Sequence, residues 1–190
     1  MNLEVVICHF KENLDWVSQL KHKYVIYNKN PKNSHMFEKN LPNYGFDTIA
    51  YLTYIIENYN NLPDYVCFSQ DNPFFHCHSF LDKVNNFGFD RPFHPLGITY
   101  IRDGEPVLTQ TKNYAESLGL DYKLPIKFIN SAQCIVSKEL ILKNKIGLYQ
   151  RIKNSLPEGH VITHTNYLIE YLWPTIMNFN EELIISFQNC

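Results

Sequence analysis

The chain has 190 residues, of which 45% are hydrophobic and 19% charged, so it has enough apolar side chains to form a folded core. Its formal net charge of −2 provides no basic excess for nonspecific binding to nucleic acid or to an anionic membrane surface. The sequence contains no GxxxxGK[ST] and no GxGxxG, which argues against P-loop and dinucleotide-binding proteins.

The N-terminal segment and the cysteines favour a cytoplasmic protein. Residue 4 is a glutamate and no basic region precedes the first apolar run, so we expect no secretory signal. No apolar stretch reaches the ~18 residues of a membrane span. The five cysteines form no CxxC pair, and Cys8, Cys67 and Cys134 lie in apolar runs, where a reduced thiol behaves as a small hydrophobic group.

Three short apolar runs, at residues 3–8, 24–27 and 65–68, predict β-strands that are covered on both faces. Residues 13–20 between them predict a short helix, and residues 46–59 predict a longer amphipathic helix that ends before Pro63. This alternation predicts an α/β fold with a mixed, mostly parallel central sheet flanked by helices.

The second half of the chain is less regular. Residues 72–104 predict long loops around a helix at 79–86, and residues 109–118 predict a further helix. Residues 126–137 are typical of one or two strands, and residues 138–155 of a helix. A final helix is predicted at 165–173, where Pro174 either breaks it or opens a further short turn. No repeat or linker interrupts the chain, so we expect a single domain over residues 1–190.

Polar side chains follow each of the three early strands. These runs are His9 to Asn13, Asn28 to Asn30, and Ser69 to Asn72. In an open α/β sheet, ligands bind beyond the carboxyl ends of the strands, so these runs are the first candidates for a binding site. The alternative is that they are ordinary solvated loops.

Two further positions suggest binding of a phosphorylated ligand. Gly45 precedes a predicted helix N-terminus, whose backbone N–H groups attract anions, although Asn43 or Asp47 could instead cap that helix. Asp71 follows the third strand and could hold a divalent cation that also binds two phosphates, or it could form a turn before Pro73.

Metal-dependent and serine hydrolases have weaker support. His76 and His78 flank Cys77, but no partner pair with zinc-ligand spacing accompanies them. No GxSxG nucleophile elbow occurs. A hydrolase that binds a metal through His76 and His78 stays open as a third reading.

The combination of motifs in residues 3–29, 41–76, 130–137 and 167–177 resembles one family of small proteins. The shared pattern includes YNK, PNxGxE/D, YLxxIIxNYxxLPD and FxQxxPxxH, and it spans nearly the whole chain. The family occurs in fungi and large DNA viruses, and it is similar to the small glycosyltransferase domain of chlorella viruses that decorates the capsid protein. The resemblance implies a Rossmann-like fold of the GT-A type, Mn²⁺ or Mg²⁺, and transfer of a sugar from a UDP- or GDP-linked donor to a hydroxyl of a glycan or glycoprotein.

The resemblance also implies roles for individual residues. Those expected against the nucleotide sugar are His9, Phe10, Asn28, Lys29, Asn43, Gly45, Gln70 and Asn72. Asp71 stands where such enzymes carry an Asp-x-Asp metal motif, and His76 and Gln133 would border the acceptor. An inverting enzyme needs a carboxylate base, for which Glu170 is the first candidate and Asp47 the second. A merely solvated or hydrogen-bonded Glu170 is the alternative.

The chain departs from the family pattern at two positions. Only one of the two metal-motif aspartates is present, and Phe46 stands where many relatives have an arginine that could meet the diphosphate. Lys29 is the candidate replacement for that cation. A catalytically inactive module that binds nucleotide sugars or carbohydrates is therefore the alternative to an enzyme. Sugar-stacking platforms or simple core packing are the two readings of the aromatic residues Phe74, Phe75, Phe80, Phe87, Phe89 and Phe93.

Overall fold

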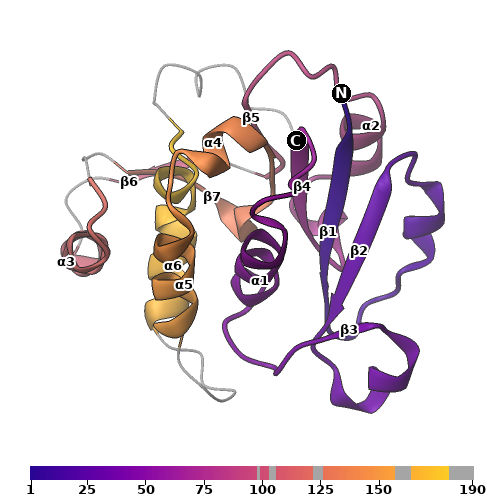
Figure 1. The fold of residues 1–190 in the computed structure, drawn as a ribbon, viewed down its shortest axis with the longest axis horizontal. Helices are drawn as coiled ribbons and strands as arrows, with labels where there is room; N and C mark the ends of the chain where they lie inside the picture. Colours follow the sequence, from indigo (N-terminus) through magenta and orange to yellow (C-terminus); the bar gives the residue numbers. More distant parts are fainter. Residues whose placement is uncertain (98, 103–105, 122–125, 157–163, 180–190) are drawn as a thin grey trace.

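A six-stranded sheet in the order β3-β2-β1-β4-β8-β5 forms the centre of the computed structural model (Figure 1). The structure describes residues 1–97, 99–102, 106–121, 126–156 and 164–179. The strands are β1 (Leu3–His9), β2 (Lys23–Asn28), β3 (Lys39–Asn40), β4 (Tyr65–Gln70), β5 (Phe93–Pro95) and β8 (Cys134–Ser137). Strands β1 to β4 run parallel, and β8 is antiparallel to both β4 and β5. The predicted mixed, mostly parallel sheet of a Rossmann-like α/β fold is confirmed.

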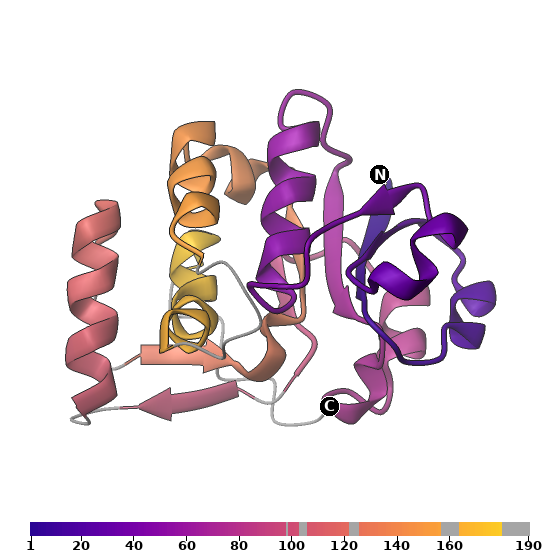
Figure 2. The same ribbon diagram turned by 90° about the horizontal axis from the view of Figure 1, so that it is seen from below.

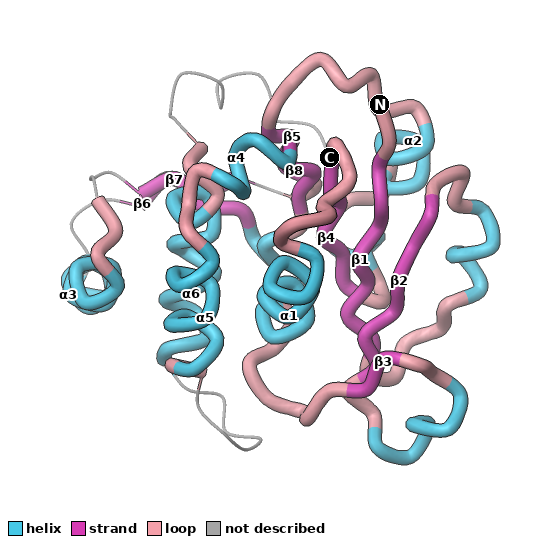
Figure 3. The backbone as a smooth tube through the Cα atoms, viewed as in Figure 1, coloured by secondary structure: helices cyan, strands magenta, loops and turns pink. Residues whose placement is uncertain are grey.

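Apolar side chains on both faces explain why the first strand is almost continuously hydrophobic. Val6 and Cys8 of β1 belong to the core on one face, and Leu3, Val5 and Ile7 belong to the core on the other. Figure 3 shows β1, β2 and β4 side by side, with α1 lying along them. Both faces are therefore covered, as the three early apolar runs predicted.

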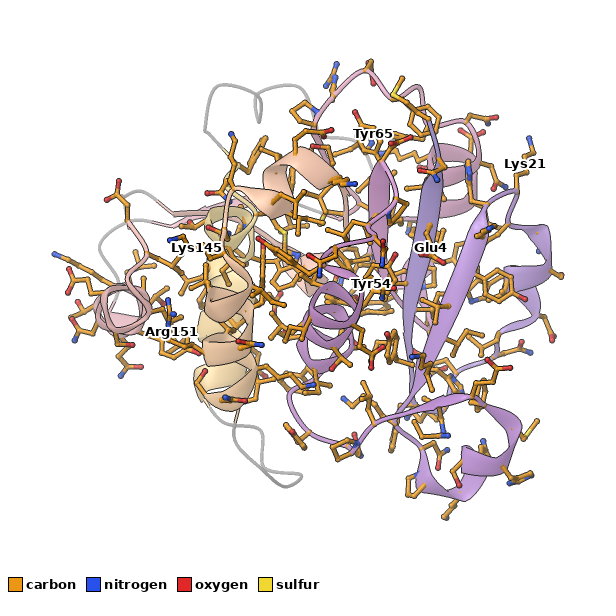
Figure 4. The ribbon with its side chains drawn as sticks, in the orientation of Figure 1. Glu4, Lys21, Tyr54, Tyr65, Lys145 and Arg151 are labelled. Atoms are coloured by element: carbon orange, nitrogen blue, oxygen red, sulfur yellow. The ribbon has the colours of Figure 1, made fainter. Side chains whose placement is uncertain are left out.

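Helices of different sizes cover the two faces. The larger core lies between the sheet and α1 (Thr48–Asn58), α5 (Ile146–Asn154) and α6 (His164–Ile176). The smaller core contains residues of the 3₁₀ helix η1 (Asp15–Gln19) and of α2 (Phe80–Asn85). Near the middle of the larger interface, Tyr54 of α1 donates a hydrogen bond to the Glu4 carboxylate of β1, and both are labelled in Figure 4.

A second, two-stranded sheet extends the molecule at one end. Its strands β6 (Thr99–Arg102) and β7 (Ile126–Ile129) are antiparallel, and β7 packs against α6. Helix α3 (Pro106–Leu118) also packs on α6, and Figure 2 shows α3 at the outer end of the two-stranded sheet formed by β6 and β7. The remaining short helices are η2 (Pro31–Met36), η3 (Pro73–Phe75), η4 (Asn130–Ala132) and α4 (Lys138–Leu142).

Three details differ from the sequence prediction. The single helix expected at 138–155 is two helices, α4 and α5, because Lys145 adopts an extended conformation between them. Helix α6 continues through Pro174 to Ile176, although Pro174 has no N–H to donate to the Glu170 carbonyl. The complete burial of Trp173 and Ile176 indicates that packing outweighs this loss. Strands β3, β5 and β6 were not predicted; β3 and β5 are short edge strands, and β5 contains Pro95.

Two other expectations concern membranes and thiols. No helix among the described residues is long and apolar enough to cross a membrane. Cys8, Cys67 and Cys134 are free and buried, as expected of small hydrophobic thiols. Cys77 is buried and disulfide-bonded, so the cysteines as a group do not uniformly support a reducing compartment.

Candidate functional site

The carboxyl ends of β1, β2 and β4 lie at one edge of the sheet. His9 at the end of β1 pairs with Asn28 of β2, and Cys8 pairs with Gln70 of β4. Strand order reverses between β1 and β4, because β2 and β3 lie on one side of β1 and β4 lies on the other. This reversal creates the crevice in which doubly wound α/β proteins bind their ligands. The three polar runs that follow the early strands therefore meet at that crevice.

A pocket of about 240 Å³ opens beside the end of β4. It combines carboxylate, amide, imidazole and aromatic side chains from four segments of the chain. Its lining residues are Phe46, Asp47, Thr48, Gln70, His76, Ser131, Ala132, Tyr167 and Glu170. Four of the residues singled out from the sequence, Asp47, Gln70, His76 and Glu170, are thus brought together.

Asp47 lies directly before α1 and faces the pocket. The Asp47 side chain makes no capping hydrogen bond to its helix; its Oδ2 instead accepts a 2.6 Å hydrogen bond from Gln70 Nε2. Burial raises the pKa of the Asp47 carboxyl, while the nearby Lys29 ammonium and the Gln70 hydrogen bond oppose that rise. The alternative reading of Asp47 as a side-chain helix cap is therefore wrong.

Glu170 reaches the same pocket from α6. Its Oε1 accepts a 2.7 Å hydrogen bond from the backbone N–H of Ser131, which fixes the orientation of the carboxyl group. Burial raises the pKa of Glu170; the Ser131 N–H opposes this rise, and the charge of Asp47 adds to it. The charge of Asp47 is therefore felt at Glu170, although burial is the larger cause of the raised pKa.

Strained backbone surrounds these carboxylates. Phe46, Ser131 and Ala132 have φ angles of 45°, 73° and 54°, in the left-handed region that non-glycine residues rarely adopt. All three line the pocket. Such conformations are costly and concentrate at functional sites, so the strain is an indication of function that is independent of the side-chain chemistry.

Lys29 stabilises the backbone of a residue that lines the pocket. Its side chain is buried, and Nζ donates a 2.6 Å hydrogen bond to the carbonyl oxygen of Phe46. This contact holds the strained Phe46 backbone and places a cation near Asp47. Lys29 therefore serves the protein's own loop, and its position does not make it the free replacement for an arginine at the diphosphate.

Asp71 anchors the loop that follows β1. Its Oδ2 accepts hydrogen bonds from the backbone N–H groups of Phe10, Lys11 and Glu12, at 2.9, 3.2 and 3.1 Å. His9 Nδ1 lies 3.3 Å from the same oxygen. His9 itself is buried, with its ring against Phe37.

These contacts bear on the metal expected at Asp71. One carboxylate oxygen already has three protein donors, and among the described residues no group of three or more His, Cys, Asp or Glu side chains could hold a metal ion. The loop thus uses Asp71 Oδ2, and the described residues offer no cluster of protein ligands around it or around His76 and His78.

Other predicted residues serve the fold. Asn28 is buried and bonds to Asn30 and Asn40, so both ends of its amide are used inside the protein. Gln133 is fully buried: its Oε1 accepts from the Gln70 N–H, and its Nε2 donates to the carbonyls of Pro73 and Leu96. Gln133 therefore does not line the pocket, but it binds the backbone of Gln70, which does.

The last four predicted binding residues lie outside the pocket lining. Gly45 has φ of 67°, and a Cβ there would lie 2.8 Å from Leu156 Cδ1, so close packing explains the glycine. Phe10 is 40% exposed on the loop that Asp71 anchors. Asn43 is half-buried and Asn72 is exposed.

Sequence reasoning assigned no site role to Thr48, Ser131, Ala132 or Tyr167, all of which line the pocket. Tyr167 carried a detectable signal, since it lies three residues before Glu170 and so shares its helix face. Ser131 and Ala132 carried none, because their importance lies in backbone conformation. Of the six aromatic residues considered as sugar platforms, Phe80, Phe87 and Phe93 are core, Phe74 and Phe89 pack against it, and Phe75 is 77% exposed.

Comparison with known proteins gives a family match without a function. Residues 5–90 match the sequence model of a family described as "Protein of unknown function (DUF3431)". No curated protein matches the chain. The matched segment contains Asp47, Gln70 and His76 of the pocket, whereas Ser131, Tyr167 and Glu170 lie beyond it. The matched segment therefore contains some of the pocket-lining residues but not the candidate base Glu170.

Proposed function

We propose that this protein is a glycosyltransferase that moves a sugar from a nucleotide diphosphate sugar to an acceptor hydroxyl. The observation that carries the proposal is the convergence of Asp47 and Glu170 in one pocket beside the strand-order reversal. The resemblance of the sequence motifs to small viral and fungal glycosyltransferase-like proteins points to the same chemistry. The expected donor is UDP- or GDP-linked, and the expected acceptor is a glycan or glycoprotein.

Glu170 is the base in this proposal. Ser131 N–H orients its Oε1, and no other hydrogen bond to this carboxylate involves a described residue, so Oε2 can accept a proton from the acceptor hydroxyl. The acceptor oxygen then forms a bond to the anomeric carbon of the donor sugar. The bond from that carbon to the diphosphate oxygen breaks, and the nucleoside diphosphate leaves with the bonding electron pair.

Asp47 and Gln70 position the reacting groups in this scheme. Their mutual hydrogen bond aligns an amide and a carboxylate in the pocket that Glu170 also lines. The charge of Asp47 also raises the pKa of Glu170 and so strengthens it as a base. Divalent-ion dependence, with Mn²⁺ or Mg²⁺, stays a prediction from the resemblance, and no step here is assigned to the ion.

A catalytically inactive module that binds nucleotide sugars or carbohydrates is the second candidate. The hydrogen bonding of Asp71 favours it, because an oxygen held by three backbone N–H groups is a poor ligand for the ion that helps a diphosphate leave. The two candidates differ in turnover.

Turnover of nucleotide sugars separates these candidates. Purified protein is incubated with UDP- and GDP-sugars and glycan acceptors, with and without Mn²⁺, and released nucleoside diphosphate is measured. We expect release that Glu170→Gln lowers by about 10²–10⁴-fold, the usual contribution of a general base, while donor binding changes little. Glu139→Gln, an exposed change on α4, is the matched control. Donor binding without release under any condition supports the inactive module.

The pH dependence of this rate gives a second readout. A base must be ionised, so activity is lost as pH falls through the pKa of Glu170. Burial raises that pKa above the ordinary 4.5, so the acid limb of the rate profile is expected above pH 4.5. An acid limb below that value contradicts the assignment of Glu170.

A cytoplasmic location, in the host cytoplasm if the chain is viral, completes the proposal. The free thiols of Cys8, Cys67 and Cys134 support a reducing compartment, and the disulfide-bonded Cys77 opposes it. The protein is isolated from its own cells without reductant, denatured and alkylated. Mass spectrometry then shows whether Cys77 was a thiol in those cells.

A further inference from the structure

Exposed aromatic rings form one wall of the pocket. Phe46 and Tyr167 are 39% and 43% exposed, and their ring centroids lie 5.9 Å apart at 59°. Phe75, which is more exposed still, lies edge-on to the ring of His76 in the pocket lining. Exposed apolar surface next to convergent polar groups marks a binding site. The C–H groups of a sugar ring are attracted by the negative face of an aromatic ring.

Hydrogen-bonding groups line the same pocket. Asp47, Gln70 and Glu170 present carboxylate and amide atoms to the same space. Ser131 Oγ is buried in this lining and has no hydrogen-bond partner among the described residues. A buried hydroxyl without a partner is costly, so a ligand that supplies a hydroxyl there gains affinity.

The size and charge of the pocket restrict the ligand further. Its volume of about 240 Å³ is below the about 300–1,000 Å³ of pockets that hold drug-sized molecules, and it suits one small ring. No lysine or arginine lines it in the described part of the chain, so an anionic ligand would meet two carboxylates without a counter-charge. Asp47 and Glu170 each already accept one hydrogen bond, from Gln70 and from the Ser131 N–H respectively, so neither requires a cation as its partner.

We propose that this pocket seats a single uncharged pyranoside, the acceptor sugar, whose apolar face stacks on the Phe46–Tyr167 pair. Its hydroxyl groups bond to Asp47, Gln70, Ser131 and Glu170, which line the same pocket. The inference rests on the proposed function, because it names the acceptor class of the transfer, and it excludes uronic acids and phosphorylated sugars as ligands of this pocket.

Matched sugars test the proposal without a donor. Methyl glycosides of glucose, galactose and mannose are titrated by saturation-transfer NMR and calorimetry at pH 7, alongside the corresponding uronic acid and amino-sugar derivatives. We expect at least one uncharged glycoside to bind with a dissociation constant on the order of 1–10 mM, which is typical of a ligand of this size. The matching uronic acid should bind at least about tenfold more weakly, as expected for an uncompensated like charge. The amino sugar should bind no tighter than the uncharged sugar.

Variants locate the bound sugar. Tyr167→Ala should weaken binding by roughly three- to tenfold, the value of one aromatic contact, and Tyr167→Phe should retain it because the ring is preserved. Tyr24→Ala is the matched control, since Tyr24 is similarly exposed but lies near the start of β2, away from the pocket. Because Tyr167 is partly exposed, both Tyr167 variants are expected to fold.

Each outcome decides the proposal. Absence of binding by all uncharged glycosides up to about 50 mM, tighter binding of the amino sugar, or insensitivity to Tyr167→Ala overturns it. Sugar binding without any transfer supports this inference and overturns the proposed enzyme. Transfer to an uncharged acceptor that does not depend on the Tyr167 ring supports the enzyme and overturns this inference.

Discussion

Gly45 has a packing role at the start of α1. Its φ of 67° is costly for residues with a Cβ, and an added Cβ would lie 2.8 Å from Leu156 Cδ1 and 3.3 Å from Ile49 Cβ. The sequence suggested that this glycine lets backbone N–H groups approach an anion. Close contact between α1 and the end of α5 accounts for the glycine without a ligand.

Gly45→Ala and Gly119→Ala separate these two costs. Gly119 ends α3 with a similar φ of 73°, but a Cβ there has no heavy atom within 4 Å. We expect Gly119→Ala to lower the free energy of unfolding by about 1 kcal/mol through backbone strain alone. Gly45→Ala should cost roughly 2–3 kcal/mol, because overpacking adds to that strain. Urea denaturation measures both, and equal losses would show that the contact with Leu156 relaxes freely.

The sequence shows which residues at the strand ends are polar, but it does not predict whether each side chain faces the pocket or bonds to another part of the protein. Asp47 and Gln70 face the pocket, whereas Asn28 bonds inward because Asn40, from a separate strand, supplies an acceptor beside it. Gln133 is likewise used up by distant backbone groups. These partners come from segments whose spatial neighbours no local pattern reveals. Asp47 and Glu170 were singled out because they match motifs of the family that the chain resembles.

Among the elements, the loop between β1 and η1 depends on one carboxylate from another strand. Asp71 Oδ2 accepts three backbone N–H groups of that loop, and its own carbonyl accepts from Trp16 Nε1. Asp71 thereby joins the ends of β1 and β4, the two strands that flank the crevice. This arrangement argues for a structural role at this position.

Asp71→Ala therefore tests the loop directly. Removing the carboxylate that accepts from three backbone N–H groups of an exposed loop should lower the free energy of unfolding by roughly 2 kcal/mol. Asp64→Ala is the matched control, because Asp64 Oδ2 accepts one backbone N–H, that of Asn2, on an exposed surface, and we expect a loss below about 1 kcal/mol. Unchanged stability of Asp71→Ala, combined with lost Mn²⁺-dependent binding of nucleotides in calorimetry, would instead make Asp71 a metal ligand.

Elements with strong periodic or continuous apolar patterns could be predicted from the sequence, and weakly patterned ones could not. The runs behind β1, β2, β4 and α1 are long enough to identify a strand or a helix. Strand β5 has three residues and a proline, so its pairing with β8 depends on tertiary context. The passage of α6 through Pro174 also depends on its burial, which local rules do not include.

At the scale of the whole molecule, the pocket joins two parts of the chain. Phe46, Asp47, Gln70 and His76 come from the first half, and η4 and α6 supply the remaining wall. The segment that matches the family of unknown function ends at residue 90 and so contains one of these parts. A protein that shares only that segment has counterparts of Asp47, Gln70 and His76 but none of Glu170. A base at that place would then have to come from another element.

Gln133 connects these two parts. It precedes β8, and its fully buried amide bonds to the backbone of Gln70, Pro73 and Leu96, so it joins the end of β4, η3 and the residue after β5. Gln70 and Ala132, the residue before Gln133, both line the pocket, so this amide links two parts of the lining.

We expect Gln133→Ala to lower the free energy of unfolding by roughly 3 kcal/mol, since it leaves buried backbone groups unpaired and opens a cavity. Gln110→Ala, an exposed change on α3, should stay within about 0.5 kcal/mol. At a temperature where Gln133→Ala is still folded, binding of the uncharged methyl glycoside should also fall, because Gln70 loses its fixed position. If folded Gln133→Ala binds the methyl glycoside with full affinity, the pocket does not depend on this amide. The hydrophobic core alone would then place α6 and Gln70.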